Sequence, residues 1–214
     1  MTNPPLTHKI TLVVATGNLA KYNEIAVLLR GLPVRIVPLD RVGPVEVPPE
    51  SGHSFQENAR IKAVAVADAT GCLALADDSG LEVDALGGEP GVRSARFGGP
   101  GKTDADRYRL LLDKLIGTPL ERRTARFRCA IAIAAPRGPV YLTDGTCEGR
   151  IAIGPRGSRG FGHDPVFEIV SLARTLAEVG PEVKNRLSHR AQALRGARAI
   201  LERLLSSRGA TEKD

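Results

Sequence analysis

Two adjacent carboxylates constrain the fold of this chain more than any other feature. Asp77 and Asp78 directly follow residues 72–76, an apolar run with the composition of a buried strand. In open α/β sheets, ligands bind beyond the carboxyl ends of the strands. Neighbouring acidic side chains at such a place repel one another unless a cation or a shared proton relieves the repulsion. We therefore expect an active site at the end of this strand, where a hard cation such as Mg²⁺ would fit best.

Hydrophobic periodicity predicts alternating strands and helices in the first half of the chain. The predicted strands are residues 10–15, 34–37, 73–76 and 81–86, and the predicted helices are residues 19–30 and 54–69. We expect the first helix to bury one face, which consists of Leu19, Tyr22, Ala26 and Leu29. Ser54 and Glu57 have the spacing of a capping box, which sets the start of the second helix. The proline-rich residues 38–51 are expected to form a long loop.

An antiparallel hairpin and a long terminal helix are predicted in the second half. The hairpin strands are residues 126–134 and 140–147, with a possible edge strand at 150–153, and helices are predicted to start at Thr103 and Ser188. The last helix would run to about residue 205 on a core stripe of Leu194, Ala197, Leu201 and Leu204. Parallel-type units followed by a hairpin predict an α/β fold with a mixed sheet flanked by helices. We expect one domain over residues 10–206, an N-terminal extension over 1–9 and a frayed tail over 207–214.

The composition limits the classes of protein and of partner. The net charge of +6 suits an anionic partner, but aromatic residues make up only 4% of the chain, which disfavours a base-stacking polynucleotide surface. No apolar run approaches the roughly 20 residues of a membrane span, and residues 1–9 lack a signal-peptide core. Cys72 and Cys129 lie in apolar runs, which favours reduced thiols over a disulfide framework. We expect a soluble, cytoplasmic protein that binds no polynucleotide and no membrane.

A glycine-containing turn between the first strand and the first helix is a candidate phosphate site. Thr16, Gly17 and Asn18 would leave free backbone N–H groups at the start of the helix, and Lys21 would add a positive charge one turn later. An ordinary N-cap by Asn18 with a solvated Lys21 explains these residues equally well. Residues 98–103 end in Gly-Lys-Thr, but they lack the first glycine of a P-loop and a buried strand before it, so we reject a P-loop.

Several candidate residues have ordinary structural explanations when each is taken alone. Glu50 is explained as a loop carboxylate and Lys62 as a surface charge, yet the apolar stretch after Lys62 predicts a buried helix that would aim it toward the acidic pair. Phe161, between two glycines, suits either stacking on a planar base or anchoring in the core. His189 and Arg190 would lie in the first turn of a helix, where the dipole disfavours cations, so we expect an anion or electron-rich acceptor nearby.

Six motifs carry a resemblance to a known family, and they occur in the same order from about residue 10 to residue 205. They are Thr16-Gly17-Asn18 with Lys21, Glu57-Asn58-Ala59 with Lys62 and Ala63, residues 76–81, residues 91–96, residues 160–167, and Ser188-His189-Arg190. In this combination the chain resembles the inosine triphosphate pyrophosphatase family, the Ham1-like nucleotide hydrolases. The resemblance implies a homodimer of α/β subunits, each with an elongated, twisted mixed sheet flanked by helices and a central cleft between two lobes.

The resemblance also implies an activity and a cofactor. The expected reaction is Mg²⁺-dependent hydrolysis of non-standard purine nucleoside triphosphates (ITP, dITP and XTP) to the monophosphate and pyrophosphate, which cleanses the nucleotide pool. Attack at the α-phosphorus requires cations that neutralise phosphoryl charge and a carboxylate that deprotonates water. Donors aimed at the 6-keto oxygen would discriminate against adenine, because its 6-amino group leaves those donors unpaired.

Site roles are carried over by position from the resemblance. Glu50, Asp77 and Asp78 would hold Mg²⁺, Asp78 would also accept the proton of the attacking water, and Lys62 would neutralise the triphosphate. The substrate-binding residues would be Thr16, Gly17, Asn18 and Lys21 at the phosphates, Ser79, then Phe161, Gly162, His163, Asp164 and Lys184 along the base, and His189 with Arg190 to read it.

One residue departs from the family pattern and leaves the base preference open. The family commonly has Tyr where this chain has His163, so the base contact would be smaller, and its charge could change between about pH 5 and 8. Three other functions are alternatives for this chain. A nucleotide-binding regulator would lack the carboxylates, a nucleic-acid-binding protein would show salt-dependent affinity for long polymers, and a related pyrophosphatase would act on modified or pyrimidine triphosphates.

Overall fold

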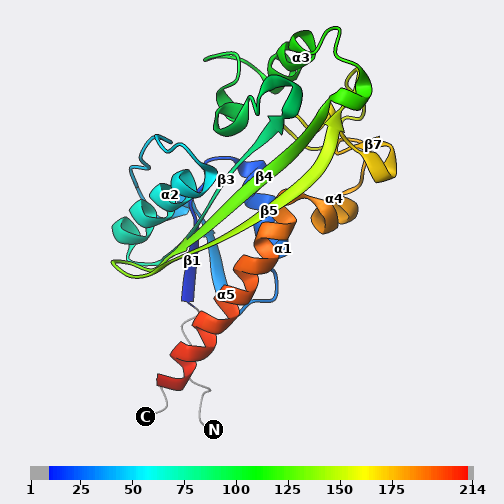
Figure 1. The fold of residues 1–214 in the computed structure, drawn as a ribbon. Coiled ribbons are helices and arrows are strands. Elements are labelled where there is room, and N and C mark those ends of the chain that lie inside the picture. The colour runs from blue at the N-terminus through cyan, green and yellow to red at the C-terminus, as the bar shows by residue number, and fades with distance from the viewer. Residues whose placement is uncertain (1–9, 212–214) are drawn as a thin grey trace.

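A seven-stranded mixed sheet with helices on both faces organises the computed structural model, which describes residues 10–211 (Figure 1). The strands are β1 (Ile10–Val14), β2 (Val34–Pro38), β3 (Leu73–Val83), β4 (Thr124–Ala134), β5 (Val140–Ile151), β6 (Phe167–Ile169) and β7 (Arg174–Thr175), in the spatial order β2-β1-β3-β4-β5-β6-β7. The helices are α1 (Leu19–Leu28), α2 (Phe55–Thr70), α3 (Asp104–Lys114), α4 (Pro181–Leu187) and α5 (His189–Thr211). Short 3₁₀ helices are η1 (Leu39–Arg41), η2 (Asp84–Leu86), η3 (Gly91–Arg96), η4 (Leu120–Arg122) and η5 (Val170–Leu172). The predicted α/β class is confirmed.

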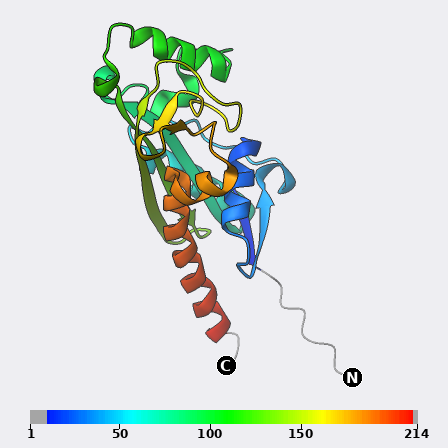
Figure 2. The ribbon, with the colours of Figure 1, turned by 90° about the vertical axis from the view of Figure 1, so that its right-hand side faces the viewer.

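The sheet is elongated because three long antiparallel strands connect two ends that have different neighbours. At one end, β1 pairs in parallel with β2 and with the first residues of β3. At the other end, β6 pairs with Arg150 and Ile151 of β5 and with β7, and α3 lies beyond the long strands (Figures 1 and 2). Each end buries its own hydrophobic clusters, so the molecule has two lobes that share β3, β4 and β5.

The acidic pair lies inside a strand, and the predicted turn between two strands is wrong. β3 runs without interruption through both carboxylates, because β4 pairs with it from Ala74 to Val83. The parallel neighbour β1 ends earlier, where Val14 lies opposite Leu75. Beyond that point the β1 side of β3 has no neighbouring strand among residues 10–211. The expected site at a strand end is therefore set by the end of β1 and not by the end of β3.

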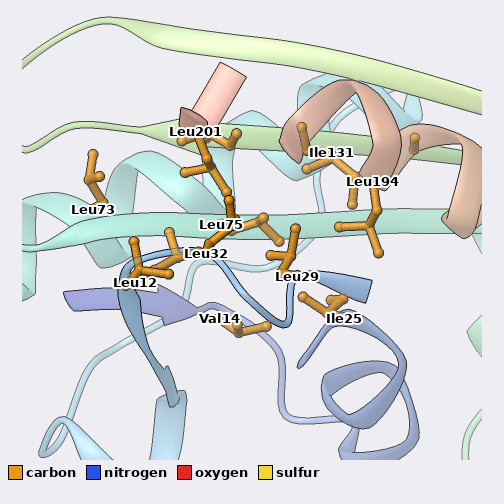
Figure 3. Close-up of a cluster of buried hydrophobic side chains, with 14 of the residues drawn as sticks. Leu12, Val14, Ile25, Leu29, Leu32, Leu73, Leu75, Ile131, Leu194 and Leu201 are labelled. Atoms are coloured by element: carbon orange, nitrogen blue, oxygen red, sulfur yellow. The ribbon is translucent and has the colours of Figure 1, made fainter. Parts of the chain in front are cut away.

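Alternation along β3 sends the two carboxylates to opposite faces of the sheet. Leu73 and Leu75 belong to the cluster formed with α1 and α5, which Figure 3 shows around Leu75. Ala74 and Ala76 instead pack in a cluster with the buried side of α2. By continuation of this pattern, Asp77 faces α1 and α5, whereas the next residue along the strand faces α2.

Helix starts were predicted more accurately than helix ends and faces. The Ser54 hydroxyl accepts a hydrogen bond from the Glu57 N–H, which is the first half of a capping box. The Glu57 carboxylate accepts from the N–H of His53 and not from that of Ser54, so the second half is not formed. Thr103 forms a complete capping box at the start of α3. In α1 the predicted face is partly wrong, since Leu19 is 70% exposed, whereas Leu29 is buried.

The terminal helix and the remaining predictions have mixed outcomes. The predicted core stripe of α5 is confirmed: Leu194, Ala197 and Leu201 are buried, and Leu204 packs against the same cluster. α5 continues to Thr211, into the expected tail, and residues 1–9 and 212–214 lie outside the described residues. Residues 150–151 extend β5 and do not form a separate edge strand. All three cysteines are free, and within residues 10–211 no helix has the length and apolar character needed to cross a membrane.

Candidate active site

A pocket of about 300 Å³ lies between the two lobes, beside the part of β3 that does not pair with β1. Its lining includes most of the predicted substrate-binding residues: Asn18, Lys21, Ser79, Phe161, Gly162, His163, Asp164, Lys184, His189 and Arg190. Thr16 and Gly17 line a neighbouring hollow of about 460 Å³, next to the start of α1. The structure therefore gathers residues from distant parts of the chain at one place, as predicted. A larger hollow of about 850 Å³ contains none of the predicted site residues in its lining.

On the α1 and α5 face, Asp77 is enclosed by cations. Its Oδ2 lies 3.1 Å from Lys21 Nζ and 3.2 Å from Arg190 Nη2, and the same Nη2 donates to the Ser79 hydroxyl at 2.9 Å. Burial alone would raise the pKa of Asp77, but the charges of Lys21 and Arg190 outweigh it and hold the pKa below its usual range. The other carboxylate oxygen, Oδ1, is buried and has no hydrogen-bond partner among the described residues.

Arg190 is accounted for by acidic side chains of the protein itself. It is 1% exposed and pairs with Glu24 of α1 as well as with Asp77. Glu24 also lies 2.9 Å from Lys184 Nζ, which in turn lies 2.6 Å from Asp164 Oδ2. Asp77 and Glu24 are the anions that we expected near Arg190 at the start of α5. Sequence reasoning missed Glu24, because an acidic residue on a helix with one buried and one exposed face has no distinguishing pattern.

On the α2 face, Asp78 lies in a separate network. Asn58 Nδ2 donates to its Oδ2 at 3.0 Å, and Lys62 Nζ lies 3.4 Å from its Oδ1. Lys62 also donates to the Asp77 backbone carbonyl at 2.7 Å and to Glu50 Oε1 at 2.8 Å. Burial raises the pKa of Asp78 to about 6, and the nearby Glu50 charge adds to the rise while Lys62 opposes it. Lys62 is thus a buried cation shared by two carboxylates, as its position before an apolar stretch predicted.

Glu50 and Asp78 are the residues best placed to hold a cation. They are close enough to share one lysine, and carboxylate oxygens are the donors that Mg²⁺ prefers. Mg²⁺ is commonly held by one or two carboxylates together with substrate phosphates, so two such groups are a fitting donor set. No group of three or more His, Cys, Asp or Glu residues among residues 10–211 is arranged as a metal site by itself. Asp77, on the other face, stays a prediction as a ligand.

The loop between β5 and β6 forms the far wall of the pocket. Asp164 Oδ2 accepts from the Phe161 N–H at 3.0 Å, and Asp104 of α3 accepts from the Gly162 N–H at 2.7 Å. Lys184 Nζ lies 4.7 Å from the centre of the Phe161 ring. The wall therefore combines one aromatic ring with fixed cations. Asp104 was not predicted, because its role depends on α3 packing against a segment far away in the sequence.

His189 stacks against a strand residue and does not project freely. Its ring is 4.7 Å from that of Phe127, with an angle of 11° between the planes. Burial lowers its pKa well below the usual value, and the Arg190 charge adds to the lowering. Its Nδ1 is buried without a hydrogen-bond partner among the described residues. A neutral imidazole has one N–H donor and one acceptor nitrogen, so Nδ1 can act as either one, depending on the tautomer.

His163 is 3% exposed and its burial lowers its pKa to about 4, with Arg107 adding to the effect and Asp104 opposing it. The neutral form is therefore favoured by folding, and its contribution to stability is present above the unfolded pKa and is lost as pH falls toward the folded pKa. Between about pH 7.5 and about pH 5, we expect the free energy of unfolding of wild type to fall by roughly 2 kcal/mol more than that of His163→Tyr. Urea unfolding at the two pH values measures this difference.

The matched control is His53→Tyr, which changes an exposed histidine. This variant should lose stability between the two pH values by the same amount as wild type. An identical pH dependence in wild type and His163→Tyr would show that His163 is not held in its neutral form.

The chain is similar to proteins of a named family. A model of the Ham1 family matches residues 12–200. The dITP/XTP pyrophosphatase of Desulforamulus reducens is 48% identical over 193 residues, which cover 90% of this chain and 96% of that protein. The dITP/XTP pyrophosphatase of Geobacillus kaustophilus is 46% identical over 203 residues, which cover 94% and 98%. The solved structure of a HAM1 protein from Coxiella burnetii has a TM-score of 0.83 at 41% identity, and the match covers 91% of this chain and 99% of that one.

Proposed function

The chain belongs to the Ham1 family, and from this premise we propose that it hydrolyses non-standard purine nucleoside triphosphates, among them ITP, dITP and XTP, to the monophosphate and pyrophosphate. The proposal rests on the pocket, whose lining has the Phe161 ring and two buried cations, Lys184 and Arg190. Asp77 and Asp78 lie beside this pocket on the two faces of β3. Water would attack the α-phosphorus, the bond from that phosphorus to the bridging oxygen would break, and pyrophosphate would leave. As the family resemblance implies, we further propose that the enzyme is a cytoplasmic homodimer.

Asp78 is the group that we propose as proton acceptor. A carboxylate whose pKa is raised to about 6 is still ionised at neutral pH, and it is a stronger base than an ordinary aspartate. Asn58 holds one of its oxygens at 3.0 Å, which fixes the plane of the carboxylate. The other oxygen lies beside Lys62 and is the one that we propose for accepting the proton from water.

Charge on the phosphates would be neutralised by residues of α1 and α2 and by Mg²⁺. Lys62 and Lys21 supply point charges on the two sides of β3. The start of α1 supplies backbone N–H groups, with the Asn18 side chain already accepting from the Lys21 N–H at 3.1 Å. We propose that Glu50 and Asp78 hold Mg²⁺, which when bound would neutralise charge on the phosphoryl oxygens. The fit of this donor set to Mg²⁺ supports the cofactor proposal.

Base selection would depend on groups that only donate hydrogen bonds. Lys184 and Arg190 have no acceptor atoms in their charged groups, and both lie over the Phe161 ring, at 4.7 Å and 5.5 Å from its centre. Each of the two residues already shares most of its N–H groups with protein acceptors, and a base with a 6-keto oxygen at this ring would accept from an N–H group that is left. A 6-amino group would meet that N–H group with its own hydrogens, and such a mismatch can discriminate by roughly 10⁴-fold.

Product analysis tests the proposed function directly. Purified protein with Mg²⁺ is incubated separately with ITP, dITP, XTP, ATP, GTP, CTP and UTP, and the products are separated by chromatography. We expect the monophosphate and pyrophosphate from the first three, with ATP cleaved at least about 100-fold more slowly. Diphosphate and phosphate as products would contradict attack at the α-phosphorus. Preferred cleavage of a pyrimidine triphosphate would favour the related pyrophosphatase reading instead.

A further inference from the structure

Glu50 lies in a long segment without regular structure, and two cations hold its carboxylate. Residues 42–53 form no helix or strand, so the backbone alone does not fix the position of Glu50. Lys62 Nζ contacts its Oε1 at 2.8 Å, and Arg96 Nη1 contacts its Oε2 at 2.6 Å. Each carboxylate oxygen thus has its own cation. The Arg96 contact comes from η3, a segment with no role in the proposed reaction so far.

The η3 segment is locked onto β3 just beyond the acidic pair. The Ser94 hydroxyl accepts from the Leu81 N–H at 2.8 Å and donates to the Gly91 carbonyl at 2.6 Å. At Gly80 a Cβ atom would lie 2.3 Å from the Gly91 carbonyl oxygen, so only glycine allows this approach. Arg96 also donates through Nη2 to the Val92 carbonyl at 3.3 Å. The guanidinium is therefore fixed relative to the strand that carries Asp78.

The two cations on Glu50 differ in what else they contact. Lys62 is buried and divides its three N–H donors among Glu50, Asp78 and the backbone carbonyl of Asp77. Arg96 is half exposed, and Glu50 is the one carboxylate that it contacts among the described residues. Without Arg96, the second oxygen of Glu50 would lose its partner and the carboxylate would be free to rotate about Lys62. The Glu50 charge would then no longer be held at a constant distance from Asp78.

We propose that Arg96 is a positioning residue, which holds the Glu50 carboxylate in the orientation that it needs beside Asp78 and Lys62. Its catalytic consequence rests on the proposed function, in which Glu50 and Asp78 share Mg²⁺. The same contact accounts for the Gly91–Arg96 segment, which the family resemblance includes but to which it assigns no task. Arg96 transmits the position of β3 to a loop that has no secondary structure of its own.

The first readout is the order of the loop in the free protein. Hydrogen exchange of residues 46–53 is followed by mass spectrometry in wild type, Arg96→Gln and Arg96→Lys, without nucleotide or metal. Arg93→Gln is the matched control, because Arg93 is an exposed arginine in the same η3 segment. We expect exchange in the loop to be roughly 2- to 5-fold faster in Arg96→Gln, as suits a half-exposed ion pair. Arg96→Lys should lie between this variant and wild type.

The second readout is the Mg²⁺ dependence of hydrolysis of dITP. We expect Arg96→Gln to require roughly 10-fold more Mg²⁺ for half-maximal rate, the size typical for losing a partner of a ligand. The KM for dITP at saturating Mg²⁺ should stay within about twofold of wild type, because Arg96 is not in the lining of the pocket for the base. Arg96→Lys should recover part of the loss, and Arg93→Gln should behave as wild type.

The outcomes separate this proposal from the proposed function. Faster loop exchange in Arg96→Gln alone, together with a shifted Mg²⁺ dependence, supports the positioning role. If the loop exchanges equally in Arg96→Gln and Arg93→Gln, the proposal is overturned whether or not the protein is an active hydrolase. A wild type that cleaves no triphosphate contradicts the proposed function, and the exchange data then still decide whether Arg96 holds Glu50.

Discussion

The Asp78→Asn variant should lose activity by roughly 10³-fold while folding at least as stably as wild type. Asparagine keeps the size of the side chain and can still accept from Asn58, but it cannot take a proton from water. Because the pKa of Asp78 is raised to about 6, the folded state disfavours the ionised carboxylate at neutral pH. Removing that charge should raise the free energy of unfolding by roughly 1–2 kcal/mol. Initial rates with dITP and urea unfolding at about pH 7.5 measure the two effects.

The matched control is Asp113→Asn, an aspartate that is exposed on α3. It should match wild type in both rate and stability. An Asp78→Asn variant that retains more than a tenth of the wild-type rate would remove Asp78 as the proton acceptor. A large loss of stability would instead show that the structure needs the charge at this position.

Arg190→Met should destabilise the fold by roughly 3–5 kcal/mol. Arg190 is 1% exposed and lies between two acidic side chains, Asp77 and Glu24. Methionine would fill much of the same volume but would leave both carboxylates with fewer cations, although Asp77 is only 1% exposed. Breaking a buried ion pair in this way is costly, because Lys21 and Lys184 alone then compensate the charges of Asp77 and Glu24. The loss is measured by denaturant unfolding at about pH 7.5.

Two further variants make this result interpretable. Arg195→Met changes an exposed arginine of the same helix and should alter stability by less than about 0.5 kcal/mol. Adding Asp77→Asn to Arg190→Met should recover part of the loss, because the buried carboxylate that has lost its arginine is removed. If Arg190→Met and Arg195→Met prove equally stable, the ion pairs around Arg190 contribute little to the fold.

Local sequence signals predicted the elements of this fold better than their continuity. The helix starts at Ser54 and Thr103 were predicted correctly, because capping signals depend on neighbours within a few residues. The unbroken path of β3 was missed, because two adjacent aspartates look like a turn unless a long antiparallel partner such as β4 is known. Helix α4 was also missed, since a helix of 7 residues is too short to show an apolar period.

The site was predicted as a set of residues, but not as an arrangement in space. Motifs placed Lys62, Asp78 and Arg190 in one site, and the structure brings them together around the part of β3 that does not pair with β1. The partners that fix them were not predicted. Glu24 and Arg96 make contacts to residues far away in the sequence. Glu24 has no local pattern that marks it, and Arg96 lies in the motif of residues 91–96, to which the resemblance assigned no role. Such contacts follow from tertiary packing, which a single sequence does not reveal.

The uncovered edge of β3 has a consequence for how enzymes of this design can diverge. The groups that would select the base lie with Arg190 on one face of the strand, and the proposed proton acceptor, Asp78, lies on the other. One backbone separates them, so substitutions in the first set need not disturb the second. A change of substrate during evolution therefore needs substitutions on one face of β3 alone, while the residues proposed for hydrolysis on the other face stay the same. Transplanting α4 and the loop before β6 between relatives would exploit the same independence in the laboratory.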